Sequence, residues 1–390
     1  MKKQVEKEIS KGKHQKHAKL ARPQSGFYAR NEIGLFGTSC SKLKPLANKI
    51  AELIGGWNIS YLDEKHQKDI SQEPKNHLSY TLTKEGSGIS SVKLDVWNPY
   101  QIKKRLSDTD LLLVNNNHFE TEKQVLVLDP EKDLSKKLDK TYDIQAVYAL
   151  DDKGESDIKK EYERLMLLRG KSYEIEVPFF SYGQEKELAD FLSDIPKQNI
   201  SNIKGLVLSG GKSVRMGKDK SKIDYHGKPQ KDYVYDLLTE QLDEVYFSCR
   251  EDQLSEFEGR DVITDKFYGL GPFGAILSAF QHDPDSAWLV VAIDLPLIDP
   301  ASIKNLLSSR NASKAATCFI NPETEWHEPL MAIYEPKIYQ SALSFLGMGY
   351  SCPRKVLINN DVEKLQVTDA SFLTNVNTPE DLEKISLKTS

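Results

Sequence analysis

A glycine-containing loop followed by a run of cations could bind a nucleoside triphosphate. Gly210 and Gly211 follow a short apolar run at 205–208, and glycines there admit positive φ and let a ligand approach the main chain. Amide N–H groups in such a loop can bind phosphate oxygens. The pattern is neither the GxxxxGK[ST] nor the GxGxxG motif, so a plain turn beside a solvated charge run stays open as the alternative. The cations that could neutralise a leaving pyrophosphate are Lys212, Arg215, Lys218 and Lys220.

An aspartate at the end of the clearest apolar run is a candidate metal ligand. Asp294 follows Trp-Leu-Val-Val-Ala-Ile at 288–293 and precedes Leu-Pro, so its carboxylate is expected at the carboxyl edge of a sheet. Mg²⁺ prefers hard oxygen ligands, with few protein carboxylates and with substrate phosphates completing the shell. The position of Asp294 beside a phosphate-binding loop therefore predicts a magnesium site there. The alternative is a carboxylate that only caps the next helix.

Alternating strands and helices must position these residues. This alternation predicts a mostly parallel sheet covered on both faces over residues 203–390. The expected strands lie at 205–208, 245–249, 262–265, 288–294, 315–319 and 328–334, and the expected helices at 233–242, 275–280 and 300–307.

The N-terminal half, 31–194, predicts a second domain of the same class, so the expected fold is two three-layer α/β domains. A loop after its first strand resembles a degenerate P-loop, because Gly37 opens it and Ser41-Lys42 stands where Gly-Lys-Ser/Thr is expected, without the second glycine. The polar run 115–120 follows an apolar strand, at the edge where open α/β sheets bind ligands. The expected strands are 58–63, 110–115, 124–128 and 144–150, and the expected helices 46–54, 158–168 and 185–192.

Composition narrows the class of protein. The chain has 390 residues and a net charge of −5, which argues against a general nucleic-acid binder. Its sequence has no apolar run long enough to span a membrane, and its four scattered cysteines lack zinc-type spacing, so we expect a cytoplasmic protein.

Residues 1–30 are predicted to form a basic arm, and residues 195–202 a linker between the two domains.

Several motifs in order resemble one enzyme family. The string Leu-Ser-Gly-Gly…Arg-Met-Gly…Asp-Lys…Gly-Lys-Pro over 208–229 resembles the signature of the sugar-nucleotide-type nucleotidyltransferases, most closely the molybdenum cofactor guanylyltransferases. The resemblance covers about 203–388 and implies a Rossmann-like domain of the nucleotide-diphospho-sugar transferase type. It implies that Lys220 contacts the triphosphate, with Arg215 neutralising pyrophosphate. Its nucleotide-binding loop would comprise Leu208, Ser209, Gly210 and Gly211.

The remaining motifs imply further roles. Asp294 matches the family's metal-binding aspartate, Asp265 its second acid near the nucleotide, and Gly271 belongs to a turn like the family's PGPLAG loop. Ser248 stands where the family often has an asparagine near the base or ribose. Towards the second substrate the resemblance implies His327, although Glu328 separates it from Pro329, and the asparagines of Asn-Val-Asn-Thr-Pro, Asn375 and Asn377.

The resemblance implies a Mg²⁺-dependent enzyme that transfers GMP from GTP to Mo-molybdopterin. Lys220, Arg215 and Asp294 would be its catalytic residues. A cytidylyltransferase, a transferase for another phosphorylated acceptor and a non-catalytic cofactor-binding adapter stay open as alternatives. Residues 30–180 are more loosely similar to the P-loop adapters of molybdopterin guanine dinucleotide synthesis, which suggests molybdoenzyme apoproteins or other cofactor-biosynthesis proteins as partners. Neither nucleic acid nor membrane is expected to be bound.

Overall fold

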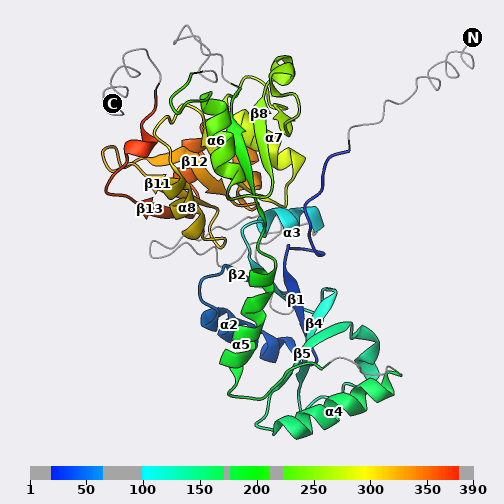
Figure 1. The fold of residues 1–390 in the computed structure, drawn as a ribbon. Helices are drawn as coiled ribbons and strands as arrows, with labels where there is room; N and C mark the ends of the chain where they lie inside the picture. The colour runs from blue at the N-terminus through cyan, green and yellow to red at the C-terminus, as the bar shows by residue number, and fades with distance from the viewer. Residues whose placement is uncertain (1–18, 65–98, 171–175, 211–222, 377–390) are drawn as a thin grey trace, which may run out of the picture.

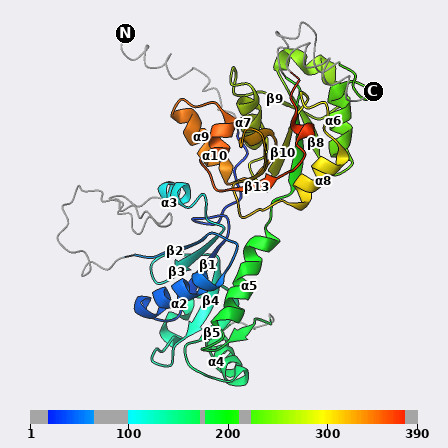
Figure 2. The same ribbon diagram turned by 90° about the vertical axis from the view of Figure 1, so that its left-hand side faces the viewer.

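The chain forms two α/β domains, each built on its own sheet (Figure 1). The computed structural model describes residues 19–64, 99–170, 176–210 and 223–376. Helix α5 of the first domain runs towards the second domain, and the chain then enters the second sheet (Figure 2). The prediction of two α/β domains is confirmed.

The first sheet has six parallel strands in the order β2-β3-β1-β4-β5-β6. The interior strand β3 is buried along its whole length, as its continuous apolar run predicts for a strand covered on both faces. The strands are β1 (Glu32–Phe36), β2 (Ile59–Leu62), β3 (Leu111–Asn115), β4 (Lys123–Leu128), β5 (Asp143–Ala149) and β6 (Phe179–Phe180).

Helices cover both faces of this sheet and complete three layers. Helices α2 (Cys40–Leu53) and α5 (Glu185–Gln198) contribute Leu43, Ile50 and Leu192 to one hydrophobic cluster. Helix α4 (Glu155–Leu168) packs its apolar stripe on the other face. Two shorter elements complete the domain, α3 (Pro99–Arg105) and the 3-10 helix η2 (Ser135–Lys140).

The second sheet has seven strands in the order β13-β11-β12-β10-β7-β8-β9. It is mostly parallel, as predicted, but β12 runs antiparallel to both of its neighbours. The N-terminal end of β12 therefore lies at the same edge as the carboxyl ends of β10 and β11. The strands are β7 (Ile203–Leu208), β8 (Val245–Cys249), β9 (Val262–Thr264), β10 (Ala287–Ala292), β11 (Ala316–Ile320), β12 (His327–Tyr334) and β13 (Val362–Gln366).

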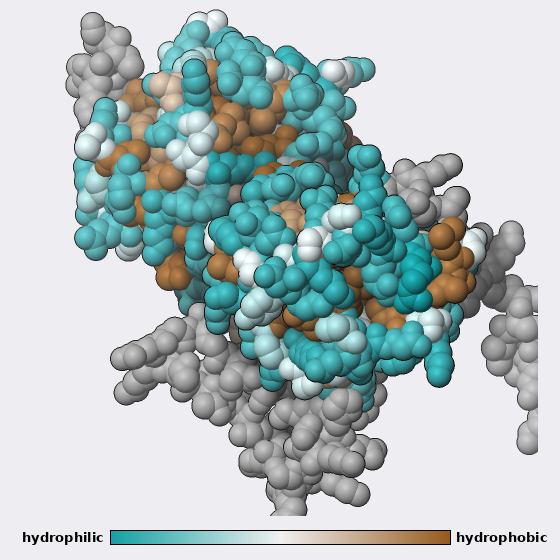
Figure 3. Space-filling model, turned by 90° about the horizontal axis from the view of Figure 1, so that it is seen from below, coloured by the Kyte–Doolittle hydropathy of each residue, from teal (hydrophilic) through white to brown (hydrophobic). Residues whose placement is uncertain are grey.

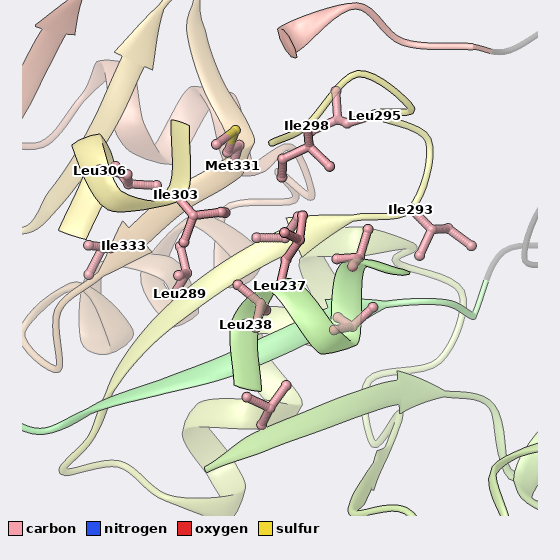
Figure 4. Close-up of a cluster of buried hydrophobic side chains, with 14 of the residues drawn as sticks. Leu237, Leu238, Leu289, Ile293, Leu295, Ile298, Ile303, Leu306, Met331 and Ile333 are labelled. Atoms are coloured by element: carbon pink, nitrogen blue, oxygen red, sulfur yellow. The ribbon is translucent and has the colours of Figure 1, made fainter. Parts of the chain in front are cut away.

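Two helical layers sandwich this sheet. Figure 4 shows the core on one face, where Leu238 of α6, Leu289 of β10 and Ile303 of α8 meet. The cluster on the other face contains Trp288, which is fully buried. The helices are α6 (Gln230–Thr239), α7 (Pro272–His282), α8 (Pro300–Ser308), α9 (Ile338–Gly347) and α10 (Pro353–Ile358), with the 3-10 helices η4 (Glu251–Phe257) and η5 (Ser371–Leu373).

The connection between the domains is shorter than the sequence predicted. Helix α5 extends to Gln198 instead of ending at Leu192, and Pro196 lies in its last turn. Leu192 and Pro196 are both buried, so packing compensates for the main-chain hydrogen bond that a proline cannot donate. Only residues 199–202 separate α5 from β7.

Ion pairs join the two domains. Lys337 of the second domain pairs with Asp110 of the first, and their side chains are only 12% and 7% exposed. The Lys337 ammonium also donates to the Ser313 carbonyl at 2.8 Å. Arg30, at the end of the predicted arm, pairs with Asp285 of the second domain at 3.5 Å. The contact between the domains therefore includes charged pairs.

The outer surface of the first domain is mainly hydrophilic. Seen from below, hydrophobic residues appear there as groups set among hydrophilic ones (Figure 3). Among the described residues, no helix combines the length and apolar character that crossing a membrane would need.

Candidate functional site

Three neighbouring strands bring the predicted nucleotide-binding residues together. Leu208, the last residue of β7, is paired with Ser248 of β8 on one side and Ala292 of β10 on the other. The Ser209 amide and hydroxyl both donate to the Ser248 carbonyl, at 3.1 and 2.9 Å. The Ser248 hydroxyl in turn donates to Asp265 Oδ1 at 3.1 Å. The carboxyl edge of the second sheet therefore gathers predicted residues that are far apart in the sequence.

Gly210 makes a close approach that a side chain would obstruct. A Cβ atom at this position would lie 3.2 Å from the Cys249 Cα atom. Arg250 Nη1 donates to the Gly210 carbonyl at 3.1 Å, and the same guanidinium pairs with Asp252 at 2.9 Å. Sequence analysis did not single out Arg250, because no motif contains it. The structure shows it holding the start of the loop in place.

Six residues that the sequence singled out lie outside the described residues: Gly211, Lys212, Arg215, Lys218, Lys220 and Asn377. The described chain resumes at Ile223, which packs against Leu297 and Val376. The structure therefore does not test the predictions for these six residues.

Asp294 lies in the turn after β10, half-buried. Its carbonyl accepts a hydrogen bond from the Val376 amide at 3.0 Å, which places the predicted Asn375 close by in the chain. On the other side, His226 Nε2 lies 2.8 Å from the Pro296 carbonyl. Burial and, after it, the charge of Asp294 raise the pKa of Tyr225. Segments from three parts of the domain therefore meet around Asp294.

Asp265 is a half-buried acid held by its neighbours. Burial raises the pKa of its carboxyl group, while the Ser248 hydroxyl and the charge of Arg250 act in the opposite direction. Gly271 follows as the N-cap of α7 with φ of 56°, a conformation that glycine adopts readily. It makes the turn that the sequence predicted, and Pro272 occupies the first position of the helix.

His327 and Glu328 begin β12 as buried polar residues. Burial is the main factor that raises the pKa of Glu328, and the charge of Asp294 raises it further. Sequence analysis treated Glu328 as an interruption between His327 and Pro329. In the structure, Glu328 is a second carboxyl group whose charge interacts with that of Asp294. The only sign of this in the sequence was that an acidic residue begins an apolar strand.

His327 is 9% exposed, and its Nε2 atom has no hydrogen-bond partner among the described residues. Burial lowers its pKa, and the charges of Lys364 and Arg354 lower it further. We therefore expect the free energy of unfolding to fall as the pH drops below about 6.5, the value for an unperturbed histidine, because the unfolded state takes up the proton first. The loss is complete below the folded-state pKa.

Denaturant unfolding at several pH values checks this expectation. His327→Gln should reduce the difference in stability between pH 8 and pH 5 relative to wild type, while the same change at the exposed His282 should preserve it. Equal pH dependence in wild type and His327→Gln would show that His327 does not titrate differently on folding.

The donor set at this edge fits a hard cation. Asp294 and Asp265 offer carboxylate oxygens, and the buried Asn375 Oδ1 has no hydrogen-bond partner among the described residues. Mg²⁺ binds such oxygens together with substrate phosphates. Asp294 could therefore hold the predicted metal.

The corresponding loop of the first domain is arranged differently. Only Thr38 and Ser39 separate Gly37 from α2, so few main-chain amides are available for a phosphate. Lys42 pairs with Asp129 at 3.0 Å and with Glu131 at 2.7 Å. A lysine held by two carboxylates is poorly placed to bind an anion. The P-loop-like character of this domain therefore stays a prediction.

Known proteins resemble the C-terminal half of the chain. Residues 205–362 match the family described as the MobA-like NTP transferase domain. A molybdenum cofactor biosynthesis bifunctional protein of Synechocystis sp. is 35% identical over 47% of this chain, which spans 53% of that protein's length. A probable molybdenum cofactor guanylyltransferase of Natronomonas pharaonis is 30% identical over 46% of this chain and 95% of its own.

A solved structure aligns with a similar share of the chain. It is molybdopterin-guanine dinucleotide biosynthesis protein A from Archaeoglobus fulgidus, with 24% identity and a TM-score of 0.41 over 47% of this chain and 99% of that one.

Proposed function

The chain belongs to the molybdenum cofactor guanylyltransferase family, and from that premise we propose that its C-terminal domain transfers GMP from GTP to Mo-molybdopterin. One observation in the structure supports this most directly. The Ser209–Gly210 loop, the Ser248–Asp265 pair and Asp294 lie at one sheet edge. An edge that combines main-chain donors with acids suits a nucleotide and its metal.

The reaction is a nucleotidyl transfer that needs no general base. A terminal phosphate oxygen of molybdopterin attacks the α-phosphorus of GTP. The bond from that phosphorus to the oxygen bridging to the β-phosphate breaks, and pyrophosphate leaves with the electron pair. A phosphate nucleophile is already ionised at neutral pH, so the protein contributes positioning and charge stabilisation.

Each part of the site has a role in this proposal. The Gly210 and Gly211 amides would bind GTP phosphates, as the sequence motif implies, and Asp265 would orient the nucleoside. Asp294 would hold Mg²⁺, which neutralises charge on the phosphates when it is bound. Lys220 and Arg215 would neutralise the leaving pyrophosphate, as the sequence motif implies. His327, Asn375 and Asn377 would contact the second substrate.

Nucleotide preference is the first test of this proposal. We expect GTP with Mg²⁺, but not CTP, ATP or UTP, to raise the melting temperature, because a ligand that binds only the folded state stabilises it by RT ln(1 + [L]/Kd). A response to CTP alone would indicate a cytidylyltransferase. No response to any nucleotide would contradict nucleotidyl transfer and favour the adapter alternative.

Pyrophosphate release then separates an enzyme from a nucleotide-binding adapter. The whole two-domain chain should release pyrophosphate only when GTP, Mg²⁺ and molybdopterin are all present. Binding of GTP without pyrophosphate release under these conditions would contradict catalysis. If pyrophosphate were released with a different phosphorylated acceptor but not with molybdopterin, that acceptor would replace molybdopterin as the second substrate.

A further inference from the structure

We propose that the N-terminal domain binds a zinc-type divalent cation through Cys40, Asp63 and His118. Cys40 opens α2 after β1, Asp63 directly follows β2, and His118 lies three residues beyond β3. The sheet order β2-β3-β1 makes these three strand ends neighbours. The proposed site is thus at the carboxyl edge of the first sheet, where open α/β sheets bind ligands, and it is independent of the proposed transferase function.

The three side chains converge closely enough to share one ion. Cys40 Sγ lies 3.1 Å from His118 Nε2. One ligand atom from each of Cys40, Asp63 and His118 lies within 4.8 Å of the other two. A thiolate sulfur, an imidazole nitrogen and a carboxylate oxygen are the ligand types that zinc takes in proteins. The sulfur ligand argues against Mg²⁺ and Ca²⁺, which prefer oxygen.

Neighbouring polar groups hold these ligands as a metal site requires. The Glu64 carboxylate lies 3.6 Å from His118 Nδ1, which leaves Nε2 directed towards Cys40. Such a carboxylate–histidine–metal arrangement fixes the ring and its tautomer. Asn115 Nδ2 donates to Asp63 Oδ1 at 2.7 Å, so the Asp63 ligand is oriented by a hydrogen bond.

Three protein ligands leave a fourth position for a small ligand. Zinc sites with three protein ligands keep that position for water or substrate, whereas structural sites fill all four. All three side chains are half-buried, so solvent can reach them. The alternative to a metal site is a Cys40–His118 hydrogen bond without an ion. Such a pair would not need the carboxylate of Asp63, so the involvement of Asp63 distinguishes a metal site from a simple hydrogen bond.

Metal binding can be measured on the whole two-domain chain after treatment with a chelator. We expect calorimetry to show one Zn²⁺ per chain, and Co²⁺ substitution to give a thiolate-to-cobalt charge-transfer band with the visible bands of a tetrahedral site. Cys40→Ser should abolish the charge-transfer band. The matched control Cys352→Ser changes an exposed cysteine of the other domain and should retain it.

A second variant tests zinc binding without replacing a proposed ligand, so a loss of binding cannot be attributed to misfolding. Glu64 is exposed, with 61% of its side chain accessible, so Glu64→Gln should leave the fold intact while weakening zinc binding about 10–100-fold. Asp63→Asn should also weaken it. Equal zinc affinity in wild type, Cys40→Ser and Glu64→Gln would overturn the proposal, as would a charge-transfer band that persists in Cys40→Ser.

Discussion

Replacing Asp294 with asparagine is expected to lower turnover by about 10²–10³-fold, the range seen when one preorganised electrostatic group is removed from an active site. The substitution removes a charge but nearly preserves shape. The main-chain hydrogen bond from Val376 to the Asp294 carbonyl does not depend on the side chain. The fold should therefore survive while the metal is held more weakly.

Pyrophosphate release measured over a range of Mg²⁺ concentrations checks this prediction. Asp294→Asn should require more Mg²⁺ for half-maximal activity, and thermal unfolding without nucleotide should match wild type. Asp361→Asn is the matched control, because Asp361 forms an exposed surface pair with Lys314 in the same domain. Wild-type turnover in Asp294→Asn would exclude this residue from catalysis.

Replacing Asp110 with alanine is expected to destabilise the protein by about 3–5 kcal/mol, because it leaves the buried Lys337 charge without its partner. The two side chains are only 7% and 12% exposed. Asp110 Oδ2 also accepts from the Asn58 amide at 2.9 Å, so the substitution leaves a main-chain donor unsatisfied as well. Both effects act at the junction of the two domains.

A double substitution separates the lost ion pair from other damage. Asp110→Asn with Lys337→Met removes both charges and keeps an acceptor for the Asn58 amide, so it should recover most of the stability. Denaturant unfolding measures each variant, and Lys314→Met, which breaks the exposed pair with Asp361, should cost at most about 1 kcal/mol. A cost for Asp110→Ala no greater than that would contradict a buried, stabilising pair.

Much of the transferase domain could be predicted from the sequence because local patterns determine it. The apolar run of β10 and the glycines after β7 each gave the right element, and parallel strands then placed Asp294 and Ser209 at one edge. The direction of β12 could not be predicted. Its pairing with β10 joins residues 288–291 to 331–334, and burial on both faces leaves no alternation that would reveal its orientation.

The cluster in the first domain shows a second limit of sequence analysis. The polar run after β3 was recognised from the sequence, but Cys40, Asp63 and His118 are too far apart along the chain for a spacing motif. Their proximity depends on β3 lying between β1 and β2. That strand order is set by tertiary packing, which no short stretch of sequence encodes.

The long separation between Asp110 and Lys337 along the chain determines when their contact can form during synthesis. The two residues are 227 positions apart, and at about 5–20 residues per second a ribosome adds Lys337 about 11–45 s after Asp110. Domains generally fold as units, the N-terminal one first, so the nascent first domain waits with this contact surface uncovered. Charged groups are well hydrated during that delay, whereas an apolar surface of the same extent would invite aggregation. An interface that contains ion pairs therefore suits a protein whose two domains come into contact only after both have been synthesised.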